Sequence, residues 1–278
     1  MFAPLNPPIR DWRGQRVWLV GASSGIGAAL AAELMRLGAR VALSARRPAA
    51  LAEVAPRAAA PGSAGEAPLL LPLDVTDTAA VRDAHDRILA EWGGIDVPVW
   101  LAGTYTPMRA HAFDRDAAQQ LLDTNLAIFH GLSVLLPTLR RQGRGALAIV
   151  SSVAGYRGLP NSLVYGPSKA ALNNLADALY LDLHPLGVGV HLICPGFVDT
   201  PLTALNDFRM PGLIAPEAAA RHIVDGFARG RYEIRFPAGF TLVMRLLGML
   251  PHRLYFALVR RFTGSDHAPA HAPDTPSR

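Results

Sequence analysis

Cysteine and long apolar runs are the scarcest features of this 278-residue sequence. Cys194 is the only cysteine, which excludes a disulfide within the chain and fits a reducing compartment, and we interpret it as a core residue. No uninterrupted apolar segment reaches the roughly 18 residues that can cross a bilayer, and the first residues lack the pattern of a signal peptide. We therefore expect a cytoplasmic protein without a membrane-spanning helix.

Clusters of basic residues are also missing, although the formal net charge is +5. The arginines are scattered, without the Lys/Arg runs of nucleic-acid-binding proteins, so we expect no nucleic-acid partner. The positive charge still suits small anionic groups such as phosphates. We expect no metal site, because the histidines near the C-terminus, His267 and His271, form only a weak pattern.

Short apolar segments alternate with helical patterns along most of the chain. Half of the residues are hydrophobic, which is enough for a substantial core. Strict alternation of this kind predicts βαβ units and a parallel sheet covered on both faces. Strands are expected at 17–20, 40–45, 69–73, 97–101, 146–150 and 188–193, with a seventh candidate at 232–236, and long helices at about 114–136 and 162–183.

Nothing in the sequence marks a boundary between domains. Residues 1–14 are expected to form an extended arm, because three prolines there oppose a helix. A single domain is expected over 15–263, followed by a disordered tail at 264–278 that is rich in Pro, Ala and His.

Three glycines follow the first predicted strand and lead directly into a predicted helix. The segment reads Gly21-Ala22-Ser23-Ser24-Gly25-Ile26-Gly27, and strand, glycine turn and helix form the context of a dinucleotide-binding site. Gly21 allows a tight turn, while Gly25 and Gly27 leave room for a pyrophosphate and for the helix to pack on the strand. The N–H groups that begin the helix would face the phosphates. An ordinary strand-to-helix loop is the alternative.

The second predicted strand is followed by two arginines instead of the acidic residue that binds the ribose of NAD. Arg46 and Arg47 could pair with the 2′-phosphate of NADP(H), with Arg46 the better candidate because it is nearer the strand end. Two solvated arginines are the alternative. After the third strand, Asp74 could accept a hydrogen bond from the adenine amino group or cap the next helix, for which Asp77 is the more natural residue.

A tyrosine and a lysine stand four residues apart in the long helix near 162–183. Tyr165 and Lys169 would share one helix face, and the ammonium group would lower the pKa of the phenol, which could then exchange a proton with a carbonyl or alcohol oxygen. Ser152, directly after the fifth strand, adds a hydroxyl at the same edge of the sheet. An incidental pair on a solvated helix face is the alternative.

Taken together, these motifs resemble the short-chain dehydrogenase/reductase family in its branch of ordinary length. The matching segments extend over residues 17 to 200 in the order and spacing of that family: Gly21 to Gly27, Asp74-Val75, Asn125, Ser151-Ser152, Tyr165-x-x-x-Lys169 and Pro195-Gly196-Phe197-Val198-Asp199-Thr200. The resemblance implies an α/β fold, a Rossmann-like doubly wound parallel sheet of seven strands in three α/β/α layers.

The resemblance also implies roles for single residues. Tyr165 would be the general acid/base, and Ser152 would hydrogen-bond the substrate oxygen. Lys169 would hold the nicotinamide ribose and depress the pKa of Tyr165, and Asn125 would support a water in a proton relay. The cofactor would contact Gly21, Ser23, Ser24, Gly25, Ile26, Gly27, Arg46, Arg47, Asp74, Val75, Ala102, Gly103, Tyr165, Lys169, Pro195, Gly196, Val198 and Thr200.

Two positions depart from the family pattern, one of them slightly: Val20 stands where the glycine fingerprint often begins with Thr. The family often has Asn-Asn-Ala-Gly after the fourth strand, where this chain has Trp100-Leu101-Ala102-Gly103. The Ala-Gly pair remains, so the backbone can still approach the cofactor. Other groups must replace the missing side-chain amides in stabilising this central strand.

The substrate end of the site is apolar in the sequence. A lid is expected at about 200–216. Apolar residues of the lid and its neighbourhood favour an apolar substrate: Leu202, Leu205, Phe208, Met210, Leu213, Tyr105, Met108, Tyr156 and Leu159. Ordinary packing of these residues is the alternative. Two apolar C-terminal helices with basic edges are expected at about 238–262. We favour their packing on the core, the lid or a partner subunit, and peripheral membrane contact is the alternative.

We therefore predict an NADP(H)-dependent oxidoreductase that prefers NADP(H) to NAD(H). It would transfer a hydride between the nicotinamide and a carbonyl or secondary alcohol substrate. A non-catalytic NADP(H)-binding sensor or scaffold is the alternative, and an epimerase or dehydratase is a further one. The family resemblance suggests a homodimer or homotetramer formed through the two long helices. The physiological substrate is not predicted.

Overall fold

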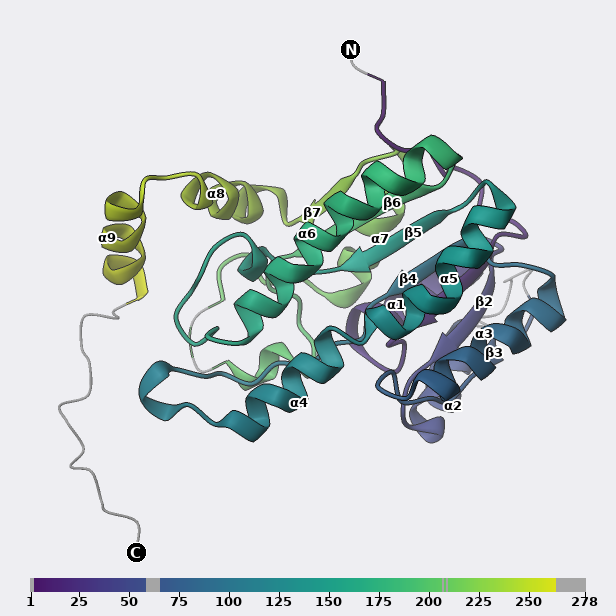
Figure 1. The fold of residues 1–278 in the computed structure, drawn as a ribbon, viewed down its shortest axis with the longest axis horizontal. Coiled ribbons are helices and arrows are strands. Elements are labelled where there is room, and N and C mark those ends of the chain that lie inside the picture. The colour runs from purple at the N-terminus through teal and green to yellow at the C-terminus, as the bar shows by residue number, and fades with distance from the viewer. Residues whose placement is uncertain (1–2, 59–65, 207, 209, 264–278) are drawn as a thin grey trace, which may run out of the picture.

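A seven-stranded parallel sheet forms the centre of the molecule, with strand order β3-β2-β1-β4-β5-β6-β7 (Figure 1). The computed structural model describes residues 3–58, 66–206, 208 and 210–263. The strands are β1 (Arg16–Val20), β2 (Arg40–Ser44), β3 (Leu69–Leu70), β4 (Val97–Trp100), β5 (Ala146–Val150), β6 (Gly189–Pro195) and β7 (Glu233–Phe236). The seventh candidate strand is thereby confirmed.

Helices cover both faces of this sheet (Figure 1). They are α1 (Gly25–Arg36), α2 (Pro48–Ala58), α3 (Thr78–Trp92), α4 (Arg115–Asn125), α5 (Ile128–Gln142), α6 (Tyr165–Leu183), α7 (Pro216–Ala228), α8 (Ala238–Gly248) and α9 (His252–Thr263), with short 3-10 turns η1 (Ala110–Ala112), η2 (Val153–Gly155), η3 (His184–Leu186) and η4 (Thr203–Leu205). The predicted α/β/α arrangement is correct.

Strand β1 shows how the two layers of core arise. Val17 and Leu19 point into the cluster beneath α1, α2 and α7, while Trp18 and Val20 point into the cluster beneath α3, α5 and α6. Successive side chains of a strand alternate between faces, and both faces here are apolar, as a parallel sheet requires. β1 pairs with β2 on one side and β4 on the other, so the strand order reverses there and ligands are expected at its carboxyl end.

Several predicted boundaries need correction. The predicted helix at 114–136 is two helices, α4 and α5, separated by Leu126 and Ala127. The third strand keeps only Leu69–Leu70 because it pairs with β2 over two residues at the edge of the sheet. An 18-residue window between Arg115 and Gln142 is apolar enough to cross a bilayer, but half of that window is buried, as in a core helix.

The N-terminal arm is extended and attached to the domain. Asn6 is buried, donates to the Val190 carbonyl at 2.7 Å and accepts from the Val190 amide at 3.0 Å. Trp12 is 3% exposed and packs edge-on against Phe227 of α7. The predicted tail at 264–278 lies outside the described residues.

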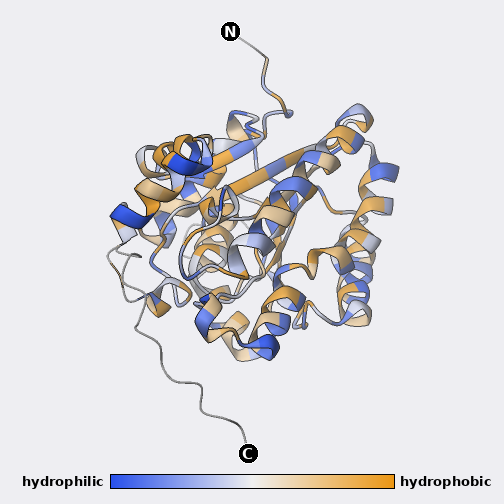
Figure 2. Cartoon of the chain, turned by 60° about the vertical axis from the view of Figure 1, so that its left-hand side comes forward, coloured by the Kyte–Doolittle hydropathy of each residue, from blue (hydrophilic) through white to orange (hydrophobic). Residues whose placement is uncertain are grey.

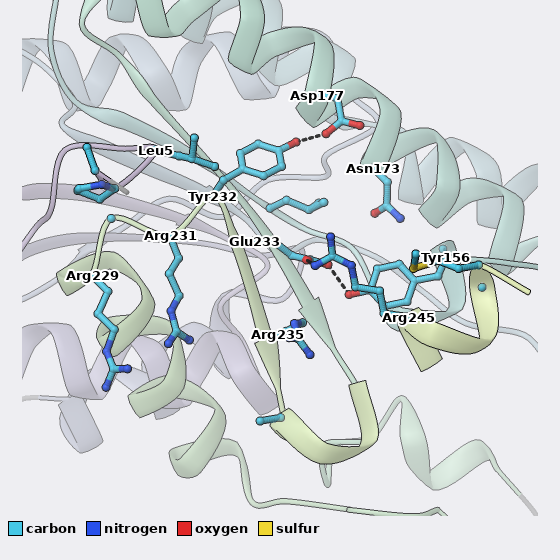
Figure 3. Close-up of a pocket in the computed structure, with 18 residues that line it drawn as sticks. Leu5, Tyr156, Asn173, Asp177, Arg229, Arg231, Tyr232, Glu233, Arg235 and Arg245 are labelled. Atoms are coloured by element: carbon cyan, nitrogen blue, oxygen red, sulfur yellow. Dashed lines mark hydrogen bonds and ion pairs between the residues drawn. The ribbon is translucent and has the colours of Figure 1, made fainter. Parts of the chain in front are cut away.

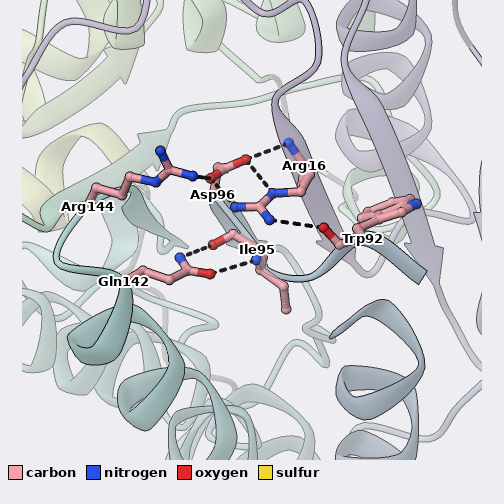
Figure 4. A network of polar contacts seen from close by, with 6 residues as sticks. All are labelled: Arg16, Trp92, Ile95, Asp96, Gln142 and Arg144. Carbon is pink, nitrogen blue, oxygen red and sulfur yellow. Dashed lines mark hydrogen bonds and ion pairs between the residues drawn. The ribbon is translucent and has the colours of Figure 1, made fainter. Parts of the chain in front are cut away.

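A polar network joins β1 and β4 at their amino ends (Figure 4). The Arg16 guanidinium donates to both carboxylate oxygens of Asp96, at 2.7 and 2.6 Å, and to the Trp92 carbonyl at 3.1 Å. Burial alone would raise the pKa of Asp96, but the hydrogen bonds and charge of Arg16 outweigh it and lower that pKa. Charge pairing therefore stabilises the amino end of the sheet. Ligands are expected at the opposite, carboxyl end.

Candidate active site

The glycine turn is packed so closely that side chains are excluded from it. Gly21 has φ +100°, and a Cβ atom there would lie 2.6 Å from the Ala102 nitrogen. A Cβ atom on Gly27 would lie 2.3 Å from the Gly21 carbonyl oxygen, because α1 rests directly on the turn. The positive φ and the close approach of the Ala102 backbone explain Gly21, and packing of α1 on the turn explains Gly27.

The first turn of α1 faces a cleft. Gly25 has φ +53° and its Cα lies against Thr200, so a Cβ would meet Thr200 Cγ2 at 2.7 Å. Ser24 precedes the helix as its N-cap without forming a side-chain capping hydrogen bond. Its side chain therefore leaves the first N–H groups of α1 available to a phosphate. The cleft, of about 190 Å³, is lined by Gly21, Ser24, Gly25, Ile26, Gly27, Leu101, Gly103, Val150, Ser151, Ser152, Tyr165, Lys169, Pro195, Gly196, Val198, Thr200, Pro201, Leu202 and Thr203.

A second cavity, of about 570 Å³, lies beyond the ends of β2 and β3. Arg46, Asp74 and Val75 line it, which brings three predicted cofactor residues together. Arg47 is exposed and is not among the lining residues. The cavity also has polar walls that the sequence analysis missed, from Thr104, Thr106, Gln120, Asp123, Thr124 and His130.

Asp74 does not cap the following helix. Its carboxylate accepts from the Thr76 amide at 2.9 Å and hydroxyl at 2.8 Å, whereas Asp77 caps α3 through the amides of Ala79 and Ala80. Those bonds from Thr76 lower the pKa of Asp74, and the nearby Arg46 charge lowers it further. Asp74 is thus held as an ionised acceptor beside Arg46.

Tyr165 and Ser152 stand where two cavities meet. Both line the cleft beneath the glycine turn, and both line a neighbouring cavity of about 130 Å³. The Ser152 hydroxyl oxygen accepts from the Ala154 amide at 3.1 Å, so its own hydrogen can be donated. The Tyr165 ring packs edge-on against Tyr105, with ring centroids 5.0 Å apart. The alternative of a solvated Tyr–Lys pair is wrong, because Lys169 is only 4% exposed.

The end of β5 holds Lys169 in place. Its Nζ donates to the Val150 carbonyl oxygen at 3.1 Å, and Ser151 Oγ donates to the Lys169 carbonyl at 2.9 Å. These bonds fasten the first turns of α6 to the end of β5. Burial lowers the pKa of the Lys169 ammonium from 10.5 to about 8.

Lys169 is the only lysine of the chain, so its titration can be observed in isolation. In protein labelled with ¹³Cε-lysine, we expect a single lysine NMR resonance that titrates near pH 8 and moves to near 10.5 in denaturant. Because the unfolded chain keeps this proton longer, stability should rise with pH between those values. An inflection near 10.5 in the folded protein would contradict the burial argument.

Tyr165 has the opposite shift. Burial raises its pKa to about 12, and the hydrogen bond with Ser152 opposes that rise. Lys169 Nζ lies 5.6 Å from the centroid of the Tyr165 ring. In the protein alone the phenol is therefore protonated at neutral pH, and the depression of its pKa by Lys169 stays a prediction.

Gly103 explains how Asn125 reaches this site. A Cβ atom on Gly103 would lie 3.2 Å from Asn125 Oδ1 and 3.4 Å from Lys169 Nζ, so both side chains rest against the same Cα. Asn125 accepts from the Thr104 amide at 2.7 Å and donates to Ser168 Oγ at 2.9 Å. It also ends α4, in keeping with the break between α4 and α5. Its part in a water relay stays a prediction.

The segment that departs from the family pattern is stabilised without side-chain amides of its own. Trp100 is 2% exposed and packs on Gly131 of α5, where a Cβ would lie 2.2 Å from the indole ring. The strand end is held by the Leu101 amide on the Val20 carbonyl and by the Asn125 bond to Thr104. The side chain of Asn125, from α4, thus holds the backbone directly after this segment.

The cavity shared by Tyr165 and Ser152 is mainly apolar. Of the residues predicted to line it, Tyr105, Leu159, Leu202 and Phe208 do so. The others lie elsewhere: Leu205 and Leu213 are exposed, Met108 belongs to a separate cluster, Tyr156 faces another cavity, and Met210 is not a lining residue.

Sequence reasoning missed three walls of this cavity, Phe197, Phe240 and Met244. The spacing of Phe240 and Met244, four residues apart on α8, was the available signal, since such a pair shares one helix face.

The largest of these cavities, about 930 Å³, lies at the free edge of β7 and is separate from Tyr165 (Figure 3). Tyr156 donates to Glu233 at 2.5 Å, and Arg245 of α8 pairs with the same carboxylate at 2.6 Å. Tyr232 also donates to Asp177. These pairs join α6, β7 and α8, so the cavity walls are held by polar contacts between elements.

Known proteins are similar to this chain over most of its length. The model of the family described as short chain dehydrogenase matches residues 15–208, which include the glycine turn, Ser152, Tyr165 and Lys169. The chain belongs to the short-chain dehydrogenases. An uncharacterized oxidoreductase of Myxococcus xanthus is 37% identical over 244 residues, covering 87% of this chain and 95% of that protein.

Other short-chain dehydrogenases resemble the chain more distantly. Human dehydrogenase/reductase SDR family member 7 is 34% identical, covering 68% of this chain and 60% of its own length. The 11-beta-hydroxysteroid dehydrogenase A of Sesamum indicum is 29% identical, covering 84% and 71%. A short-chain type dehydrogenase/reductase from Mycobacterium marinum has a crystal structure that aligns with TM-score 0.73 and 28% identity, covering 83% and 97%.

Membership of the short-chain dehydrogenases makes the protein an oxidoreductase of a family that uses nicotinamide cofactors on small molecules. The residues present fit such a cofactor, since the turn around Gly21 and Gly27 has no room for side chains and α1 begins at the cleft.

Proposed function

We propose that the protein is an NADP(H)-dependent enzyme that interconverts a carbonyl compound and a secondary alcohol. One observation carries this proposal: Tyr165 and Ser152 line both the cleft beneath the glycine turn and the adjoining apolar cavity. A substrate in the cavity would place its oxygen beside these two hydroxyls. The cofactor, when bound, supplies or accepts the hydride at the substrate carbon.

The two hydroxyls have different parts. Tyr165 would transfer the proton at the substrate oxygen, since its phenol is protonated at neutral pH and can act as an acid during reduction. Ser152 would donate its hydrogen to the same oxygen and stabilise the negative charge that develops there. The reverse reaction needs the phenolate, for which the cation on Lys169 would lower the pKa of Tyr165.

The cofactor-binding residues are proposed from the cleft and the cavity beyond it. The turn from Gly21 to Gly27 would hold the pyrophosphate, and Asp74 and Val75 would meet the adenine. Pro195, Gly196, Val198 and Thr200 would enclose the nicotinamide end together with Ala102 and Gly103. Preference for NADP(H) is supported by Arg46, which lines the same cavity as Asp74.

A charge reversal tests this preference. Arg46→Asp should weaken NADP(H) binding by about 10- to 100-fold, because a 2′-phosphate loses its charged partner and meets a carboxylate. NAD(H) binding should change much less. Isothermal titration calorimetry with both cofactors measures the ratio.

The neighbouring arginine supplies a matched control. Arg47→Asp makes the same charge change beside the cavity without altering a lining residue, so its effect on the NADP(H)/NAD(H) ratio should be smaller. Equal ratios in the wild type and in Arg46→Asp would refute the role of Arg46.

An apolar substrate is supported by the aromatic and aliphatic walls around Tyr165. The name of the sesame relative indicates a hydroxysteroid, an apolar secondary alcohol, so hydroxysteroids belong in a first screen. Ketones, aldehydes, hydroxysteroids and acyl thioesters should be tested with NADPH and NADH by loss of absorbance. Tight NADPH binding without turnover across the screen would favour the sensor or scaffold instead.

We further propose a homodimer or homotetramer in the cytoplasm, with contacts through α4, α5 and α6. Large apolar side chains lie exposed on or beside these helices, including Phe113, Phe129 and Leu181. Multi-angle light scattering measures the subunit number. A peripheral membrane contact is proposed for α8 and α9.

A further inference from the structure

The two C-terminal helices carry a broad apolar surface that the other residues described by the structure leave exposed. Seven large apolar side chains on these helices or at the C-cap of α8 are between 44% and 78% exposed: Leu242, Val243, Leu246, Met249, Leu254, Phe256 and Phe262. Figure 2 turns this side of the molecule forward and shows hydrophobic colour on these helices beside hydrophilic positions. Thr241 and Tyr255 of these helices are buried against the core, as the sequence favoured, whereas these exposed side chains are left for a partner subunit or a membrane.

Helix α8 presents apolar residues on two opposite faces. Phe240 and Met244 line the substrate cavity. Leu242, Leu246 and Met249, spaced four and three residues apart, lie on one exposed face. The two sets are offset by two residues, which is about 200° around a helix. One helix thus separates the substrate cavity from the outer apolar surface.

Polar contacts hold these helices in place, so the outer surface is a fixed feature. Arg157, which follows the turn that carries Ser152, donates to the carbonyls of Gly248 and Leu250 at 3.1 and 2.5 Å. Its guanidinium lies 4.1 Å from the centroid of the Tyr255 ring. Tyr255 is 2% exposed and donates to the Gly158 carbonyl at 2.6 Å.

The net positive charge of this segment indicates the kind of partner that its apolar surface would bind. Residues 238–263 contain four arginines, Arg245, Arg253, Arg260 and Arg261, and no aspartate or glutamate. Arg245 pairs with Glu233 of β7, while the other three lie on α9. A second copy of the chain seated on α9 would bring like charges together. Anionic lipid headgroups would instead complement them, and the apolar side chains would enter the boundary of the acyl chains.

We propose that α8 and α9 form a docking surface for an anionic lipid bilayer. The helices lie in the interface, with the outer face of α8 and the exposed Leu254 and Phe262 of α9 toward the acyl chains. The inner face of α8 then places the substrate cavity directly behind the membrane surface, a consequence that rests on the proposed function, whereas the docking does not.

The only native cysteine makes a direct test available. Cys194 is fully buried and burial raises the pKa of its thiol to about 12, so a thiol-reactive fluorophore should label an introduced Met249→Cys selectively. With full-length protein, fluorophore emission at 249 should shift to the blue on adding vesicles of phosphatidylcholine and phosphatidylglycerol. Pure phosphatidylcholine should produce little shift. The control Leu186→Cys, on exposed η3, should produce none with either vesicle.

Vesicle co-sedimentation provides the second readout. Replacing Leu246, Met249 and Phe262 together by Gln should reduce binding to the anionic vesicles by about tenfold or more, because three exposed apolar groups are lost. High salt should also weaken binding, since arginines contact the headgroups. Circular dichroism should show that this variant keeps the native melting temperature.

Two results would overturn the proposal. One is equal vesicle binding by the wild type and the triple variant. The other is a fluorophore shift at 249 that depends on protein concentration without vesicles, which would identify the surface as a contact between copies. Both measurements need no substrate, so failure of docking with intact NADPH-dependent turnover would leave the proposed function standing.

Discussion

Tyr165→Phe should reduce turnover by about 10²- to 10⁴-fold while NADPH binding stays unchanged. The variant removes one oxygen at the junction of the cleft and the apolar cavity and keeps the ring that packs on Tyr105. In the proposed mechanism Tyr165 exchanges the proton with the substrate oxygen, whereas Ser152 donates a hydrogen bond to that oxygen. Initial rates and calorimetric cofactor titration measure the two quantities.

Tyr180→Phe is the matched control for this experiment. Tyr180 also donates one hydrogen bond, to the Leu5 carbonyl at 2.8 Å, but it lies near the other end of α6. Its turnover should stay close to that of the wild type. Residual activity of Tyr165→Phe comparable with the wild type would refute the mechanism while leaving family membership intact.

Gly131→Ala should lower the free energy of unfolding by about 2 to 3 kcal/mol, although the residue lines neither cavity around Tyr165. A Cβ atom at this position would lie 2.2, 2.8 and 2.9 Å from three atoms of the Trp100 ring. Trp100 is buried in β4 and cannot move without disturbing the core between the sheet and α5. Such a loss would lower the melting temperature by about 4 to 12 °C, which calorimetry can measure.

The chain offers both a control and a rescue for this substitution. A Cβ on Gly239, at the start of α8, meets no atom within 4 Å, so Gly239→Ala should be neutral or slightly stabilising. In a Trp100→Leu background, Gly131→Ala should cost clearly less than in the wild type, because the smaller side chain removes the collision. An equal cost in both backgrounds would show that the two positions are not coupled.

Short-range patterns predicted the parts of the site that lie within one element or one turn. The four-residue spacing of Tyr165 and Lys169 places them on one face of α6, since the helical repeat decides that relation locally. The close packing of Gly27 on the Gly21 carbonyl likewise follows from a strand that turns directly into a helix. Arg46 and Asp74 meet because parallel strands end at the same edge of the sheet.

The parallel α/β sheet, the glycine turn and the family could be predicted from the sequence, because they depend on periodicity and on spacing along the chain. The side chains that fill the space between distant elements could be identified only in the folded structure. Trp100 packs where only a glycine at 131 leaves room for its ring, and Gly103 leaves room for the side chains of Asn125 and Lys169. Burial raises the pKa of Tyr165 and lowers that of Lys169. The exposure of the outer face of α8 was also visible only in the structure, since the hydrophobicity of a residue does not show whether it is exposed or buried. Exposure and close contact depend on which elements pack together, and that information lies in the fold.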